Sequence, residues 1–186
     1  MPLAKEKIAY TYADYLAWDE GERYEIVDGE AYMMAPPSRM HQEISMALST
    51  SINNYLEGKP CKVYAAPFAV RLNPAPDQSD DTVLEPDIVV VCDPAKLDDR
   101  GCNGAPDLII EILSPSTTRY DQIVKFNKYR EAGVREYWIV DPEKRIIMAY
   151  ELKNGEYTAV NYGDTGTVPV KILPGCEINL AAVFGA

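Results

Sequence analysis

Two apolar runs decide the fold: Leu84-Glu85-Pro86-Asp87-Ile88-Val89-Val90-Val91 and Asp107-Leu108-Ile109-Ile110-Glu111-Ile112-Leu113. Both are rich in β-branched residues, a composition that suits a buried strand better than a helix. Asp87 stands at the entrance of the first strand, and Glu111 interrupts the second. An acid inside a buried strand needs a partner, because an unpaired buried charge is costly.

A basic helix and a third apolar run follow. We expect Thr117 or Thr118 to cap the helix and Gly133 to end it before a strand at 135–140. The spacing predicts a core face of Tyr120, Ile123 and Val124 and, pointing away from it, a second face of Asp121, Lys125 and Lys128. A strand, a helix and a strand in about thirty residues resemble a crossover unit.

The rest of the chain predicts further strands and helices around this centre. A short helix capped by Thr11 is followed by a hairpin that turns at Asp28-Gly29, and Ser38 caps a helix that ends at Gly58. Residues 61–72 read as one strand, with Pro67 marking a bulge or an edge position. The tail alternates apolar and polar residues around Asn154-Gly155, which indicates antiparallel strands. The fold class is therefore α/β: a mixed β-sheet flanked by helices, with an N-terminal hairpin and C-terminal antiparallel strands.

Length and composition limit the class of protein. The 186 residues, 47% hydrophobic and 25% charged, suit a single domain over 1–186. No apolar run approaches the roughly 20 residues that cross a bilayer, and the first residues lack an apolar signal core. We therefore expect a cytoplasmic protein without a membrane partner.

The net charge of −11 argues against non-specific coating of nucleic acid, since binding to phosphates needs a positive surface. A DNA-binding role would need a local basic patch. Residues 119–135 supply one, with five basic residues against two acids, a local charge of +3. The alternative is an ordinary solvated helix face.

Cysteine and histidine usage excludes several sites. The four cysteines form no Cys-x-x-Cys pair, and two lie in strand-like contexts where a free thiol acts as a small hydrophobic group, so a structural zinc site is disfavoured. His41 is the single histidine, which excludes a metal site with several histidines.

The two acids and a helix lysine suggest a chemistry. If Asp87 and Glu111 lie at the same level on neighbouring strands, their carboxylates can bracket Mg²⁺ or Mn²⁺, and Lys125 can reach the same point from the next helix. Such a set suffices for phosphodiester hydrolysis, because the metal activates water and the lysine neutralises the phosphate. Structural roles compete with this interpretation: Asp87 as a strand-end turn former, and Lys125 as an i, i+4 partner of Asp121.

Several motifs together resemble the Uma-type family of putative restriction endonucleases, within the PD-(D/E)XK nuclease superfamily. They are Tyr24-Glu25-Ile26-Val27-Asp28-Gly29-Glu30, Pro36-Pro37-Ser38 to His41, Pro86-Asp87, Glu111-Ile112-Leu113-Ser114-Pro115-Ser116-Thr117, Asp121-x-x-x-Lys125 and Gly133-Val134-x-Glu136-Tyr137-Trp138-x-Val140-Asp141-Pro142. The resemblance implies a restriction-endonuclease-like core in which Asp87 and Glu111 bind metal, with the carbonyl of Ile112 as a further ligand.

The sequence departs from the superfamily pattern at one position. The lysine that usually follows the second acid by two residues is replaced by Leu113, and families of this kind are thought to supply it from the next helix, which implies Lys125. The resemblance also points to Glu30 as a third carboxylate and to His41 as a phosphate-binding or acid-contacting residue. Asp121 or Lys128 would support Lys125.

Three functions remain open from the sequence. The leading one is a Mg²⁺-dependent (or Mn²⁺-dependent) endonuclease acting on DNA as a homodimer, with Tyr150, Tyr157 and Tyr162 as interface candidates. The second is a nuclease-like module that binds partners or itself without cleavage, which the acidic charge favours. The third is a metal-assisted hydrolase of a small phosphorylated molecule.

Overall fold

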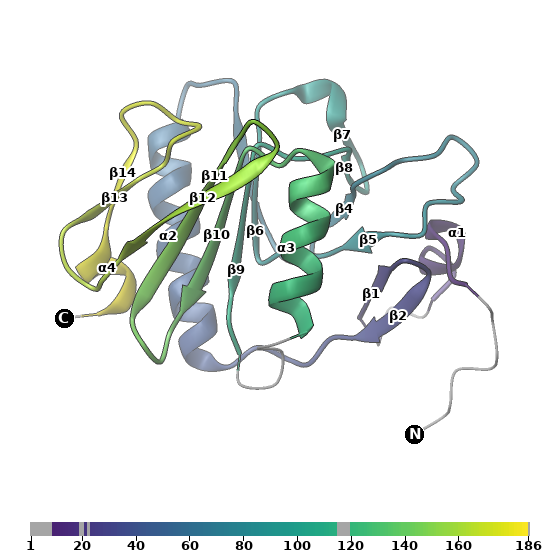
Figure 1. The fold of residues 1–186 in the computed structure, drawn as a ribbon, viewed down its shortest axis with the longest axis horizontal. Coiled ribbons are helices and arrows are strands. Elements are labelled where there is room, and N and C mark those ends of the chain that lie inside the picture. Colours follow the sequence, from purple (N-terminus) through teal and green to yellow (C-terminus); the bar gives the residue numbers. More distant parts are fainter. Residues whose placement is uncertain (1–8, 19–20, 22, 115–119, 186) are drawn as a thin grey trace.

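A computed structural model describes residues 9–18, 21, 23–114 and 120–185, apart from the side chains of residues 120 and 121. Its centre is a six-stranded mixed sheet, here called the central sheet (Figure 1). In spatial order its strands are β12 (Glu156–Tyr162), β11 (Ile146–Lys153), β10 (Glu136–Asp141), β9 (Leu108–Ile112), β6 (Ile88–Val91) and β3 (Lys62–Ala65). Neighbouring strands are antiparallel except β9 and β10. That parallel pair is joined through α3 (Tyr120–Ala132), so the predicted crossover is confirmed.

Helices cover both faces of the central sheet. Residues Ile88, Val90 and Ile110 pack with α2 (Arg39–Leu56), whereas Val89 and Ile109 pack with Tyr129 of α3. Side chains alternate between the faces of a strand, so β6 and β9 are buried on both sides and read as continuous apolar runs. Two parts of the chain complete the α2 side: β13 (Thr167–Pro169) with β14 (Glu177–Asn179), and α4 (Leu180–Phe184).

A second sheet lies beside the first and carries the N-terminal hairpin (Figure 1). Its order is β2 (Glu30–Met33), β1 (Tyr24–Val27), β5 (Val83–Leu84), β4 (Ala69–Arg71), β8 (Gly101–Asn103) and β7 (Leu97–Asp98). The hairpin turn is the predicted one, with Asp28 and Gly29 at φ values of 50° and 79°. The short helix α1 (Tyr12–Tyr15), with Thr11 as its predicted N-cap, packs on β1, and a 3₁₀ turn (Pro94–Lys96) precedes β7.

Two segments of the chain are each divided between the two sheets, although the sequence predicts one strand over the first of them, 61–72. Residues 61–72 form β3 of the central sheet and β4 of the second, and the break lies at the cis bond between Ala66 and Pro67. Residues 83–91 likewise form β5 and β6, separated around Pro86. Proline lacks the N–H that a sheet ladder needs, so each proline ends pairing where the chain passes between sheets. Asp87 therefore lies at this junction.

The predicted core face of α3 is right at Val124, which packs against the core around Tyr129, and wrong at Ile123. Ile123 is 60% exposed, whereas Tyr129 and Lys125, four residues apart, face inward and are buried. Apolar character alone misled the assignment, because carboxylates on the inner side of this helix stabilise a buried lysine there.

One further expectation also requires correction. Cys61 and Cys92 form a disulfide in the structure, since the β3–β6 register continues to place them opposite one another; Cys102 and Cys176 are free and buried. The tyrosines proposed for a dimer interface are partly buried within the chain: Tyr150 and Tyr157 lie against Phe126, and Tyr162 packs against the α2 core. Among the described helices, none is long and apolar enough to cross a membrane.

Leu48 is expected to be a main stability determinant of the α2 face. It is fully buried in that core, so Leu48→Ala should lower the free energy of unfolding by about 2–5 kcal/mol, measured by urea denaturation. Met46→Ala on the same helix, where the side chain is 69% exposed, should change it by less than about 0.5 kcal/mol. Equal losses in the two variants would contradict this packing.

Candidate functional site

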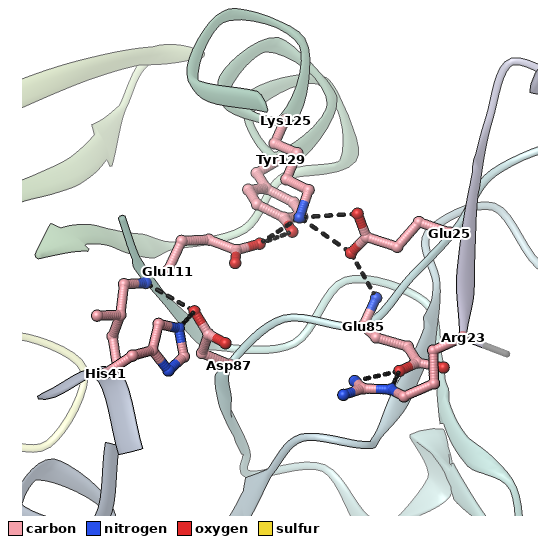
Figure 2. A network of polar contacts seen from close by, with 9 residues as sticks. Arg23, Glu25, His41, Glu85, Asp87, Glu111, Lys125 and Tyr129 are labelled. Atoms are coloured by element: carbon pink, nitrogen blue, oxygen red, sulfur yellow. Dashed lines mark hydrogen bonds and ion pairs between the residues drawn. The ribbon is translucent and has the colours of Figure 1, made fainter. Parts of the chain in front are cut away.

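Asp87 and Glu111 meet at the junction of the two sheets. Strands β6 and β9 pair Ile88 with Ile110, and one further step of this antiparallel register sets Asp87 opposite Glu111. The backbone N–H of Ile112 donates to Asp87 Oδ2 at 2.7 Å, which fixes that carboxylate against β9 (Figure 2). The expected placement of the two acids at one level on neighbouring strands is confirmed.

His41 reaches the same point from the first turn of α2. The helix begins as predicted, with Ser38 accepting a hydrogen bond from the His41 backbone N–H at 3.2 Å. The imidazole Nε2 lies 3.1 Å from Asp87 Oδ2, so of the two roles that the sequence left open, contact with an acid is the one observed. Burial alone would lower the pKa of His41, but the Asp87 carboxylate outweighs it and the pKa is raised.

Lys125 lies beside Glu111 from the other side of the sheet. Its Nζ is 3.3 Å from Glu111 Oε1, and the same oxygen accepts a hydrogen bond from the Tyr129 hydroxyl at 2.7 Å. Burial, with the nearby charges of Asp87 and Glu25, raises the pKa of Glu111 to about 7 although Lys125 and Tyr129 act to lower it. Helix α3 thus brings a lysine to Glu111, as predicted.

The raised pKa of Glu111 has a consequence for stability. A carboxyl group with a raised folded-state pKa binds its proton more tightly when folded. The free energy of unfolding therefore falls as pH rises from 4.5, the ordinary pKa of glutamate, to about 7, the pKa of Glu111 in the fold. We compare the free energy of unfolding of Glu111→Gln with that of wild type, both without metal. The variant minus wild-type difference should be more positive at pH 8 than at pH 5 by at least about 1 kcal/mol. Urea denaturation in EDTA tests this, with Glu43→Gln, at an exposed position of α2, as the control. A difference that does not change with pH would be inconsistent with the shift.

Glu25 is a member of this group that the sequence interpretation missed. Lys125 Nζ lies 2.9 Å from both carboxylate oxygens of Glu25, and Oε1 also accepts the backbone N–H of Glu85 at 2.9 Å. The signal was present, because Glu25 is an acid in an apolar strand beside Ile26 and Val27, as Glu111 is in β9. Tyr129 was also missed, and its position four residues after Lys125 was the available signal.

A further acid near the junction, Glu85, directly follows β5 of the second sheet. It accepts hydrogen bonds from the Tyr15 hydroxyl at 2.5 Å and from Arg23 Nε at 2.8 Å, and it is 5% exposed. These contacts fix the segment whose backbone N–H reaches Glu25 (Figure 2).

The remaining predicted residues lie outside this group or beyond the described side chains. Glu30 is exposed on β2 and accepts a hydrogen bond from the Tyr32 hydroxyl at 2.6 Å, so the structure does not bring it to Asp87 and Glu111. Lys128 pairs with Asp28 at the hairpin turn. The side chain of Asp121 and the cap residues Thr117 and Thr118 lie outside the described part of the chain.

The predicted basic patch at 119–135 is neutralised in the structure. Lys125 and Lys128 pair with acids as described, and Arg130 lies 3.3 Å from Glu156 and Arg135 3.0 Å from Asp107. Each of the four basic side chains that the structure describes there thus has an acidic partner. Over the described side chains, 122–135, the segment pairs its positive charges with acids and does not present them as an unpaired basic surface.

Asp87 and Glu111 are the residues of this group that could hold a hard divalent cation. Among the described residues, hydrogen bonds engage Oδ2 of Asp87 and Oε1 of Glu111, and none reaches Oδ1 or Oε2. The described residues contain no cluster of three or more His, Cys, Asp or Glu side chains arranged for a metal. Two carboxylates agree with Mg²⁺, which keeps several waters and binds through one or two carboxylates plus substrate phosphate oxygens.

Comparison with known proteins identifies the family. Residues 12–181 match the model of Uma2, described as "Putative restriction endonuclease". The chain belongs to the Uma2 family. The match spans all the described elements from α1 to β14 and includes Glu25, Asp87, Glu111 and Lys125.

Two sequence relatives of this Uma2 chain come from Synechocystis sp. The uncharacterized protein slr1290 is 29% identical over 162 residues, which cover 85% of this chain and 83% of the relative. The uncharacterized protein sll1609 is 29% identical over 146 residues, which cover 76% of this chain and 79% of the relative.

A solved structure shares the fold. It is a putative nuclease belonging to DUF820 from Anabaena variabilis ATCC 29413, with a TM-score of 0.74 and 20% identity, covering 94% of this chain and 97% of that one. The α/β nuclease-like fold expected from the sequence is confirmed.

Proposed function

We propose that this Uma2 protein is a metal-dependent endonuclease that hydrolyses DNA phosphodiester bonds. One observation carries the proposal: Lys125, from α3, stands 3.3 Å from Glu111, which faces Asp87 across β6 and β9. An acid pair and a lysine are thus assembled although Leu113 occupies the usual lysine position. Membership of a restriction endonuclease family supports the same reaction.

Asp87, Glu111 and the carbonyl of Ile112 would hold Mg²⁺ or Mn²⁺. When bound, the cation lowers the pKa of a water and offsets negative charge on the phosphate. The Lys125 ammonium group adds a second positive charge beside Glu111, in a buried setting where fixed charges act strongly on a transition state. His41 donates to Asp87 and holds its carboxylate in place. We assign no catalytic role to Glu30 or Lys128, because both contact residues elsewhere.

A plasmid assay tests the proposal. Purified protein incubated with supercoiled plasmid should yield nicked and then linear DNA with Mg²⁺ or Mn²⁺, and intact plasmid with EDTA. Low ionic strength should be used, because the acidic chain opposes association with DNA and salt weakens it further. Intact DNA with both metals would refute the endonuclease function.

A second candidate is hydrolysis of a small phosphorylated molecule. The observation that favours it is the neutralised basic segment on α3 and β10, since a small substrate needs no extended positive surface. A phosphodiester such as bis-p-nitrophenyl phosphate separates the two: turnover of this compound with plasmid left intact would favour the small-molecule hydrolase. Metal binding without cleavage of either substrate would favour the binding module.

We further propose a homodimer, since cutting both strands of a duplex calls for two sites. The interface candidates Tyr150, Tyr157 and Tyr162 are partly buried within the chain and keep part of their surface exposed. Sedimentation at several protein concentrations, with and without a DNA duplex, would reveal a monomeric enzyme if this proposal is wrong.

A further inference from the structure

We infer that Glu25 is a positioning residue that sets where the Lys125 ammonium group stands, an inference that rests on the proposed nuclease function. Glu25 comes from β1 of the second sheet, and Lys125 reaches it from the helix that covers the central sheet (Figure 2). The contact joins two parts of the fold that are 100 residues apart in sequence.

Of the two carboxylate partners of Lys125 among the described residues, Glu25 is the tighter one. Both of its oxygens lie 2.9 Å from Nζ, whereas Glu111 Oε1 lies at 3.3 Å. A lysine side chain has a flexible four-carbon stem, so the location of its charge depends on its anchors. Two short contacts from one carboxylate restrict the ammonium group more than one longer contact does.

Glu25 is itself fixed, as an anchor must be. It is 5% exposed, and its Oε1 accepts the backbone N–H of Glu85, which is held by Arg23 and Tyr15. Low exposure also strengthens the ion pair, because solvent screens it little. The order of contacts runs from the second sheet, through Glu25, to Lys125 and then to Glu111.

A second ion pair on the same two elements supplies a matched control. Asp28 at the hairpin turn pairs with Lys128, three residues after Lys125 on α3. That pair also joins the hairpin to the helix, but Asp28 is 63% exposed and neither residue contacts Asp87 or Glu111. If Glu25 only docked the hairpin onto α3, loss of the Asp28 charge should have a similar effect.

The experiment compares Glu25→Gln with Asp28→Asn in the full chain. Glu25→Gln should lower kcat for plasmid nicking by about 10²-fold, because a displacement of the Lys125 ammonium group by about 1 Å is enough for such a loss. KM should change by less than about threefold. Asp28→Asn should keep kcat within about twofold of wild type, because an exposed ion pair contributes little. Glu25→Asp, which keeps the charge but draws it back by one methylene, serves as the second variant if Glu25→Gln does not fold.

A second readout does not depend on cleavage. In ¹H–¹⁵N spectra of lysine ammonium groups, the Lys125 signal is identified by its absence in Lys125→Met. This signal should shift or broaden in Glu25→Gln and stay in place in Asp28→Asn. An unchanged signal in Glu25→Gln, or equal losses of kcat in both variants, would overturn the inference. If wild-type protein cleaves nothing, the proposed function fails, and the spectra alone still decide whether Glu25 positions Lys125.

Discussion

Asp87→Asn is expected to lower the rate of plasmid nicking in Mg²⁺ by roughly 10³-fold. This is the largest effect that we expect from replacing a single carboxylate by an amide. The amide retains an oxygen that can accept the Ile112 N–H, so the local backbone should stay as it is. What is lost is one of two negative charges on neighbouring strands. Because Mg²⁺ is bound by few carboxylates, removal of one takes away a large share of the protein's contribution to binding.

Calorimetry should show the physical cause of this loss. Mg²⁺ binding should become undetectable in Asp87→Asn, and melting temperature should remain near that of wild type. Asp77→Asn provides the control, because Asp77 is fully exposed in the loop before β5 and contacts Ser79. Wild-type cleavage by Asp87→Asn would exclude Asp87 from the reaction.

The acid pair was predictable because its signal is local. Asp87 and Glu111 each stand in a β-branched run, and an acid in such a run requires a partner. A connection that leaves and returns at the same end makes the two strands antiparallel, whereas the register that sets the acids opposite one another is seen only in the structure. Here that connection contains β7 and β8 of the second sheet rather than a simple loop.

Glu25 could not be paired with Lys125 from the sequence, because the contact depends on the second sheet. Residues 61–72 read as one strand, and in the run at 84–91 only the strand that begins at Asp87 was predicted, so that β5 was missed. Without the second sheet, β1 has no defined place beside α3. The same omission placed Lys125 on the outer face of α3, although carboxylates from both sheets surround it on the inner side.

The disulfide was missed for a related reason. Cys61 and Cys92 are 31 residues apart, and only the β3–β6 register sets them opposite one another. The register in turn depends on β3 ending before Pro67. A pattern without Cys-x-x-Cys spacing therefore carried no information about the pair.

Lys125→Met is expected to separate catalysis from metal binding. Methionine has a similar length without the charge, so nicking should fall by about 10²–10³-fold, the usual loss when a group that stabilises transition-state charge is removed. Glu25 and Glu111 then keep two buried carboxylates with no cation between them. We expect Mg²⁺ affinity to stay the same or rise, because the cation now meets a more negative site. Asp87→Asn should have the opposite effect on affinity.

Lys125→Met should also lower the free energy of unfolding by about 3–5 kcal/mol, because breaking a buried ion pair leaves an uncompensated buried charge. Protonation of the carboxylates relieves that charge, so the loss in Lys125→Met should be smaller at pH 5 than at pH 8. Lys128→Met, on the same helix but paired with the exposed Asp28, should leave nicking, Mg²⁺ affinity and stability close to wild type. If Lys125→Met nicks DNA as fast as Lys128→Met does, the helix lysine does not replace the one missing at Leu113, and the displaced-lysine mechanism is wrong.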